Sequence, residues 1–429
     1  MLRKILFSSV VLAGLFLFMP VVNAKAAPNL DGKNFFANGT AITIVEREDG
    51  QAGATITWDG GSMNVTADVT VFGGSHESDE RLETTSITMN GGEVHGIFGG
   101  GLHKSNVGST KVVVNAGKTG FVQGGGAASF SGTTCHKPWY SGDPKESPNR
   151  VDNAEVIVVN ATGTGAYPTI FGGGEGISYV GKTNVTIKGG TWAYVVAGGA
   201  NGYTGESQLT IEGGTIGVVQ SVNRGSMDAA YINIQGGKIT NAYVGGDSSD
   251  SSVTGTITSA TMQITGGKVT NALVGTNGGQ SKPATDVAKL IYDEEFVENV
   301  DESTFAEDAI VTTIDFTISM NGVSETVKVP KGLVFTQEEI DALIEDINAE
   351  LKDKGFKFGG FYTSDAFDKE FDISKEISED VTVFVKMVEI EDETITNPET
   401  SDINLISIIV AVAISSIGLG YTIKKRRFN

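Results

Sequence analysis

The sequence predicts a mainly β protein: a right-handed parallel β-helix (solenoid), followed by a small α+β module and a C-terminal transmembrane helix. Three observations support this prediction. A short motif that alternates apolar and polar residues and ends in Gly-Gly recurs with a period near 24 residues. Glycine supplies 57 of the 429 residues, nearly twice its usual share of about 7%. The C-terminus joins a long apolar run to a cluster of basic residues.

The chain begins like a secretory precursor. Arg3 and Lys4 precede an apolar run at 5–19, and small residues surround Ala24. A basic start, a short apolar core and an A-x-A-like site are typical of a signal peptide. We therefore expect signal peptidase to remove residues 1–24. The alternative is an uncleaved anchor, which normally needs about 20 apolar residues to cross the hydrocarbon core.

The repeat is clearest in the middle of the chain. Its Gly-Gly pairs there lie 24, 23 and 30 residues apart, and in most units a second glycine pair follows eight or nine residues after the first. The unit therefore carries at least two short strands, each closed by glycines. The clear copies are 185–190, 209–214, 232–237 and 262–267, and looser copies occupy 87–92, 112–117 and 156–163.

A fixed period in the twenties with glycine turns is typical of a β-solenoid. In such a coil the apolar side chains point inward and stack on the same position of the next coil, and glycine supplies the positive φ angles of sharp corners. We expect the β-helix at 25–283. Its repeats at 39–283 would make about eight or nine coils, a rod on the order of 40 Å long. A β-sandwich needs hairpin turns and a propeller needs blades of about 40 residues, so neither fits.

Two segments interrupt the period. Residues 131–153 contain Cys135, His136 and Trp139, and we predict a loop inserted between coils, a kind of segment that often carries function. Residues 284–308 are acidic and show little periodicity, so we predict a linker there.

A second module is expected at 309–390. Alternating residues on both sides of Asn321-Gly322 predict a β-hairpin, because Asn-Gly fits the tight turn between two antiparallel strands. Thr336 and Glu339 match a capping box. Apolar residues at helical spacing follow, so an amphipathic helix should begin there.

Three later segments of this module carry a family pattern: residues 354–363, 371–373 and the closing strand at 381–387. They resemble the Listeria-Bacteroides (internalin B-type) repeat of bacterial surface proteins. Gly360-Phe361-Tyr362 stands where that family has Gly-Trp-Tyr, and Met387 stands where it ends in Trp. The resemblance implies a β-grasp-like module that acts as a spacer or interaction unit, with no catalytic residues.

The C-terminal region has three parts. The run at 403–423 is long enough to span a bilayer as a helix, and Lys and Arg should hold the tail at 424–429 in the cytoplasm. The preceding domains would then lie outside the cell. The linker at 391–402 contains a pentapeptide made of Asn397, Pro398, Glu399, Thr400 and Ser401.

This arrangement resembles the cell-wall sorting signals of Gram-positive bacteria, in which sortase cuts an LPxTG-type motif after Thr and joins it to peptidoglycan. The resemblance implies that the pentapeptide is the recognition site and that cleavage follows Thr400. Asn397 replaces the usual Leu, and Ser401 replaces the usual Gly. The alternative is a retained single-pass anchor. Both lead us to expect an extracellular protein attached to the cell wall or the cell membrane.

Charge and cysteine content exclude some functions. The formal charge is −21, so the surface would repel phosphate backbones and nucleic acid is not an expected partner. Cys135 is the single cysteine and cannot form an intramolecular disulfide, so stability must come from packing.

No constellation of residues predicts catalysis or a cofactor. Carboxylates and one arginine are scattered over the repeats without recurring at equivalent positions: Asp59, Asp68, Asp79, Glu175, Arg224, Asp228, Asp247 and Asp250. The four histidines, His76, His95, His103 and His136, lack the short spacing or the cysteines typical of zinc sites. We therefore expect no catalytic residues, no metal and no cofactor.

Aromatic residues are the remaining functional feature of the repeats. They fall in successive coils at Tyr179, Trp192, Tyr194, Tyr203, Tyr231 and Tyr243. A stacked column of this kind could bind sugar rings, although ordinary packing also explains each residue. We expect an adhesin-like surface protein that binds a glycan, matrix or host protein. The alternatives are a wall-anchored polysaccharide lyase or glycoside hydrolase, and a structural stalk without a ligand.

Overall fold

The computed structural model describes residues 26–128, 146–246, 255–275, 285–352 and 354–390. The predicted signal peptide, the sorting pentapeptide, the membrane span and most of the inserted loop lie outside these residues. In the part of the chain that the structure describes, no helix combines the length and the apolar character needed to span a membrane. The described protein is mainly β, as predicted.

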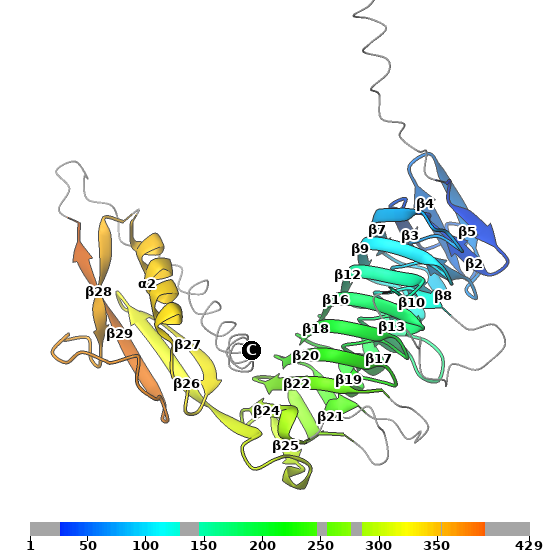
Figure 1. Ribbon diagram of the computed structural model, residues 1–429. Helices are drawn as coiled ribbons and strands as arrows, with labels where there is room; N and C mark the ends of the chain where they lie inside the picture. Colours follow the sequence, from blue (N-terminus) through cyan, green and yellow to red (C-terminus); the bar gives the residue numbers. More distant parts are fainter. Residues whose placement is uncertain (1–25, 129–145, 247–254, 276–284, 353, 391–429) are drawn as a thin grey trace, which may run out of the picture.

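Most of the described chain runs alternately through two long sheets, which together form a stack of coils (Figure 1). After the first few strands, each strand pairs in parallel with a strand from the neighbouring coil. The first sheet contains β1 (Asn29–Asp31), β2 (Asn34–Phe36), β6 (Thr70–Phe72), β8 (Glu93–Phe98), β10 (Lys118–Gln123), β13 (Thr162–Gly163), β14 (Thr169–Phe171), β17 (Thr191–Val196), β19 (Thr215–Val222), β21 (Lys238–Gly246), β23 (Lys268–Leu273) and β25 (Val297–Val300).

The second sheet lies opposite the first and carries the copies of the repeat. Its N-terminal end is an antiparallel meander made of the first three strands in the list below, β3, β4 and β5. Its strands within the stack are β3 (Ile42–Val45), β4 (Ala54–Trp58), β5 (Gly61–Val65), β7 (Arg81–Met89), β9 (Ser105–Val114), β12 (Asn149–Val158), β16 (Ser178–Ile187), β18 (Tyr203–Ile211), β20 (Ser226–Ile234), β22 (Ile257–Ile264) and β24 (Ala288–Tyr292). A short third ladder joins β11 (Ala127–Ala128) to β15 (Glu175–Gly176).

The repeat copies stack position on position, as the sequence predicts. Ile187 pairs with Ile211, and the same row continues through Ile234 and Ile264. All four side chains are fully buried in one apolar core between the two sheets. The strands alternate inward and outward residues, so this row and the row two residues before it supply the second sheet's share of the core.

Glycines form the corners that follow these rows. Gly190 and Gly214 have φ values of +94° and +101°, which residues with a Cβ rarely adopt. A Cβ on Gly214 would lie 3.0 Å from the carbonyl oxygen of Gly190 on the neighbouring coil. Glycine therefore allows both the turn and the close approach of successive coils.

The segment predicted as an acidic linker, 284–308, contains two further strands. β24 and β25 pair in parallel with β22 and β23 and extend both sheets, and they are flanked by 3₁₀ turns at Thr285–Val287 and Glu302–Thr304. Leu290 lies in register with Met262, and Val297 with Val269. The linker prediction missed these strands because this segment has few apolar residues and many acidic residues lie between them.

The predicted inserted loop also ends earlier than 153. β12 begins at Asn149, and Val151 pairs with Val107 of β9 and Val180 of β16. Val151 is the one apolar residue among Asn149–Asn153, so the sequence shows no alternation to indicate a strand. These five residues therefore belong to the stack.

The second unit begins on the last strand of the stack. Its strands are β26 (Ile310–Met320), β27 (Val323–Pro330), β28 (Phe356–Tyr362) and β29 (Val381–Glu389), with one helix, α2 (Gln337–Lys352). The strand order is β27-β26-β29-β28, with β26 and β29 parallel and the other pairs antiparallel. α2 packs on this sheet through Ile340, Leu343, Ile347 and Leu351, forming a core separate from that of the stack.

Two local predictions for this unit are confirmed. Asn321 and Gly322 both have positive φ and join β26 to β27. The Thr336 backbone N–H donates to Glu339 Oε2 (2.7 Å), and the Glu339 N–H donates to Thr336 Oγ1 (3.3 Å), which completes the capping box.

β26 joins the two parts of the molecule (Figure 1). Its first residues pair in parallel with β24, and Phe316–Ser319 pair with β29. Lys328 on β27 adds an ion pair to Asp293 at the end of the stack (2.7 Å) and another to Asp315 (2.9 Å). A shared strand and a charged contact therefore connect the second unit to the stack.

Candidate functional site

A polar groove crosses the outer face of the second sheet over β7, β9, β12, β16 and β18, with a volume of about 590 Å³. Its outward side chains form two rows along the stack, in register from strand to strand. The first row is Thr84, Ser109, Asn153, Lys182 and Glu206, and the second is Ser86, Lys111, Glu155, Asn184 and Gln208.

The groove lies beside a bend that every one of these strands makes at the same position. In a flat strand the side chains alternate between the two faces, but Glu83 and Thr84 of β7 are both exposed. On each of these strands one residue at the bend is left out of the pairing with the neighbouring strand, as Gly181 and Gly205 are on β16 and β18. A Cβ on Gly205 would lie 2.4 Å from the Gly181 carbonyl oxygen, so β18 requires glycine here, whereas β7 and β12 carry Glu83 and Asp152 at the same position.

The charged residues of the groove neutralise one another. Lys111 pairs with Glu155 at 2.7 Å and Lys182 with Glu206 at 3.1 Å, each across neighbouring strands. The remaining outward groups are hydroxyls and amides. The groove is therefore rich in hydrogen-bond donors and acceptors but carries no net charge.

On the other side of the bend the same strands carry a row of arginine and tyrosine. Arg81 donates to Asp152 (2.8 Å), and Arg150 donates to the other oxygen of that carboxylate (2.9 Å). The Arg150 guanidinium lies 5.5 Å from the centre of the Tyr179 ring, which stacks on Tyr203 at 5.9 Å with an interplanar angle of 17°. These contacts hold the row in one arrangement.

Two carboxylates stabilise this row. Burial raises the pKa of Asp152, but the hydrogen bonds from Arg81 and Arg150 outweigh it and leave the pKa below its usual value. Asp152 therefore stays ionised at neutral pH. At the far end, the Tyr203 hydroxyl donates to Asp228.

The structure brings only part of the predicted aromatic column to this site. Tyr203 belongs to the arginine-tyrosine row, and Tyr231 of β20 pairs with Gln208 and continues the second row of the groove. Tyr194 lies on the first sheet, against Tyr167. The predicted aromatics therefore do not form one column.

Trp192 is a correction to the predicted ligand-binding set, and Tyr243 lies away from the groove. Trp192 is 2% exposed and lies in the apolar core, in register with Ile216. Tyr243 is 5% exposed and lies on the first sheet, in register with Gln220. Alternation along β17 turns Trp192 inward, which the spacing of aromatics between coils does not reveal.

Sequence reasoning missed the polar rows and the residues of the arginine-tyrosine row other than Tyr203 and Tyr179. The signal was present in the repeat. Lys182 and Glu206 each precede the first apolar residue of their copies by three positions. Aligning the copies by their Gly-Gly pairs collects the residues of both rows on β7, β16 and β18.

Four of the scattered carboxylates singled out in the sequence make local contacts: Asp68, Asp79, Glu175 and Asp228. Asp79 pairs with Lys104, and Glu175 accepts from Gln123 at 3.4 Å. Lys33 and Thr66 lower the pKa of Asp68 to about 2. Asp247 and Asp250 lie outside the described residues.

Comparison with known proteins gives no matching family model, no similar curated protein and no similar solved structure. Function is therefore inferred from the geometry of the groove and from the sequence.

Proposed function

We propose that this chain is an exported, non-enzymatic bacterial surface protein that binds a glycan along the polar groove of the stack. We also propose that the stack is a right-handed parallel β-helix. The observation that carries the proposal is a groove of hydroxyls, amides and paired charges. It carries no net charge and lies beside the arginine-tyrosine row. The side chains of the groove stand on five strands that pair in parallel within one sheet.

A polyhydroxylated chain fits this groove in length and chemistry. Five strands about 4.8 Å apart span on the order of 20 Å along the stack, so an extended ligand would contact every coil. Sugar hydroxyls donate and accept hydrogen bonds, as do the side chains of Ser109, Asn153 and Gln208. Tyr231, at the end of the second row, supplies an aromatic face with a polar tip.

The carboxylates of the groove favour binding over catalysis. A glycoside hydrolase needs one carboxylic acid that donates a proton and a second carboxylate as base or nucleophile. Glu155 and Glu206 each form an ion pair with a lysine on the neighbouring strand, so both carboxylates are already engaged by lysines. A polysaccharide lyase or glycoside hydrolase is therefore the second candidate.

The rest of the chain supports display at the cell surface. The signal peptide and the pentapeptide at 397–401 support export and attachment to peptidoglycan by sortase, with a retained membrane anchor as the other possible outcome. The strand order of the second unit, with a helix over a mixed sheet, supports a β-grasp-like spacer of the internalin B type. The glycan-binding stack would then stand away from the wall.

Incubating the full-length chain with a panel of polysaccharides tests the proposal. We expect retention of at least one glycan without release of products. Release of unsaturated or reducing-end products would support the lyase or hydrolase. A chain that neither retains nor cleaves any glycan, but retains a matrix or host protein, would contradict the glycan ligand.

A further inference from the structure

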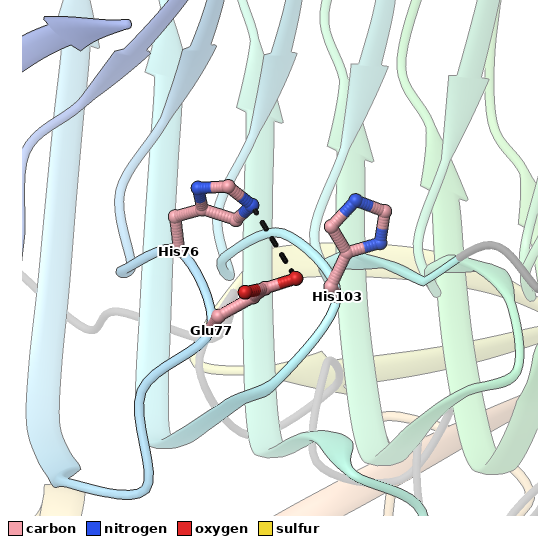
Figure 2. A group of neighbouring side chains, drawn as sticks. All are labelled: His76, Glu77 and His103. Carbon is pink, nitrogen blue, oxygen red and sulfur yellow. Dashed lines mark ion pairs between the residues drawn. The ribbon is translucent and has the colours of Figure 1, made fainter. Parts of the chain in front are cut away.

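His76, Glu77 and His103 form a cluster on two neighbouring coils, near the N-terminal end of the stack (Figure 2). One potential ligand atom from each residue lies within 4.8 Å of the others. The two segments are joined by a parallel bridge between His76 and Leu102, and the Glu77 N–H donates to the Leu102 carbonyl oxygen. Residues one repeat apart in the sequence are therefore neighbours in space.

Packing fixes the position of the first imidazole. The His76 ring stacks on the Phe36 ring with centres 5.2 Å apart and an interplanar angle of 6°. Phe36 itself stacks on Phe72, so the imidazole ends an aromatic row on the first sheet. The His103 ring lies 5.4 Å from that of His76.

The two nitrogens of His76 face different carboxylates. Nε2 lies 4.0 Å from Glu77 Oε1, and Nδ1 lies 4.0 Å from Asp31 Oδ2. A histidine that binds a metal through one nitrogen commonly donates its other ring N–H to a carboxylate, which fixes the tautomer and the ring orientation. Asp31 would take that role after a side-chain rotation that shortens its 4.0 Å distance to Nδ1.

The backbone at two of the three residues is strained. Glu77 has φ of 49° and His103 has φ of 59°, two of five non-glycine residues with positive φ in the described ranges. A side chain beyond glycine disfavours this left-handed conformation. Strain of this kind persists where the surrounding structure enforces it and often marks a functional site.

We propose that these three residues bind a divalent transition-metal ion of the zinc type. Two imidazoles and one carboxylate are a common set of three protein ligands for zinc, with a fourth position left to water or another ligand. At bond lengths of about 2.0–2.2 Å the ligand atoms would approach to about 3.3 Å. Small side-chain rotations suffice, because His76 and Glu77 are exposed and His103 is half-buried. The ion would link two coils.

Zinc content and thermal unfolding of the full-length chain, prepared without a histidine tag, test this site. We expect about one zinc per chain after equilibration and dialysis, and a higher unfolding temperature with zinc than with chelator. His76→Ala and His103→Ala should each abolish both effects. Asp31→Asn should weaken zinc binding by about tenfold or more.

His95→Ala is the matched control, because His95 is an exposed histidine on β8 whose ring packs edge-on against Phe121 and lies outside the cluster. It should retain zinc and the thermal shift. Equal unfolding temperatures of all variants in chelator show that they fold. Zinc retained by the His76→Ala, His103→Ala double variant, or no zinc bound by the unsubstituted chain, would overturn the proposal. Magnesium, which prefers oxygen ligands, should produce no shift.

Discussion

The stack and the second unit solve the problem of burying a β-sheet in different ways. In the stack, each coil covers its neighbours, and one inward row such as Ile187 to Ile264 repeats the same contact along the axis. In the second unit, a single helix covers a four-stranded sheet, and Phe316 and Leu343 belong to a core that is used once. Repetition also repeats the outward positions, and so creates an elongated polar groove that the second unit does not share.

The largest effect should come from the two cores. Phe316→Ala should destabilise the second unit by about 3–5 kcal/mol and leave the stack in place, because Phe316 belongs to the separate core. Ile211→Ala should cost the stack about 2–5 kcal/mol. Calorimetry should show two transitions that move independently. If either substitution moves both transitions equally, the two parts fold as one unit and the distinction fails.

Glycine substitutions should also act differently in the two parts of the molecule. Gly205→Ala would place a Cβ 2.4 Å from a backbone oxygen, and such overpacking typically costs about 1–3 kcal/mol. Gly322→Ala in the second unit meets nothing within 4 Å, so only its positive φ is unfavourable, by about 1–2 kcal/mol. Chemical denaturation measures both. Only Gly205→Ala should also reduce glycan binding. Unchanged binding would show that the bend at Gly205 does not shape the glycan site.

The charged contact between the two parts should contribute on the order of 1 kcal/mol, since Lys328 is partly exposed. Burial raises the pKa of Asp293, but the Lys328 ammonium outweighs it and leaves the pKa below its usual value. The contribution is therefore fully present above the ordinary Asp pKa of about 4 and is lost as pH falls through the lowered pKa of the folded chain. Denaturation at pH 7 and pH 3 should show that Lys328→Met destabilises more at pH 7 than at pH 3. An equal difference at the two pH values would contradict this assignment.

The smallest effect on stability is expected in the groove. Lys182 and Glu206 are both well exposed, and such surface pairs contribute about 0–1 kcal/mol. Glu206→Gln should therefore leave the unfolding temperature almost unchanged while weakening glycan binding. A large loss of stability would show that the pair is structural and would remove it from the proposed site.

The sequence was sufficient where one residue type dictates the local geometry. Asn321-Gly322 predicted its hairpin, Thr336 and Glu339 predicted the start of α2, and the Gly-Gly pairs predicted the stacking of the repeats. It was insufficient where the alternation is weak. Leu290 and Val297 are separated by acidic residues, so the sequence predicts a linker where the structure has two strands.

The candidate sites were harder to predict because they depend on contacts between coils. Whether Trp192 faces inward depends on the phase of its strand, and that phase is not visible from the spacing of aromatics. His76 and His103 are far apart in the chain, and they meet because Leu102 pairs with His76. Both the inward orientation of Trp192 and the proximity of the two histidines depend on the register between neighbouring coils.

The central claim is that the groove on the stack, and not another surface, binds the glycan. Asn153→Trp would fill the middle of the groove with a large ring, and Thr240→Trp would place the same ring at an exposed position on β21 of the other sheet. Binding of a retained glycan is measured for both full-length variants after confirming equal unfolding temperatures. We expect Asn153→Trp to abolish binding and Thr240→Trp to preserve it. Equal binding by the two variants would contradict the account.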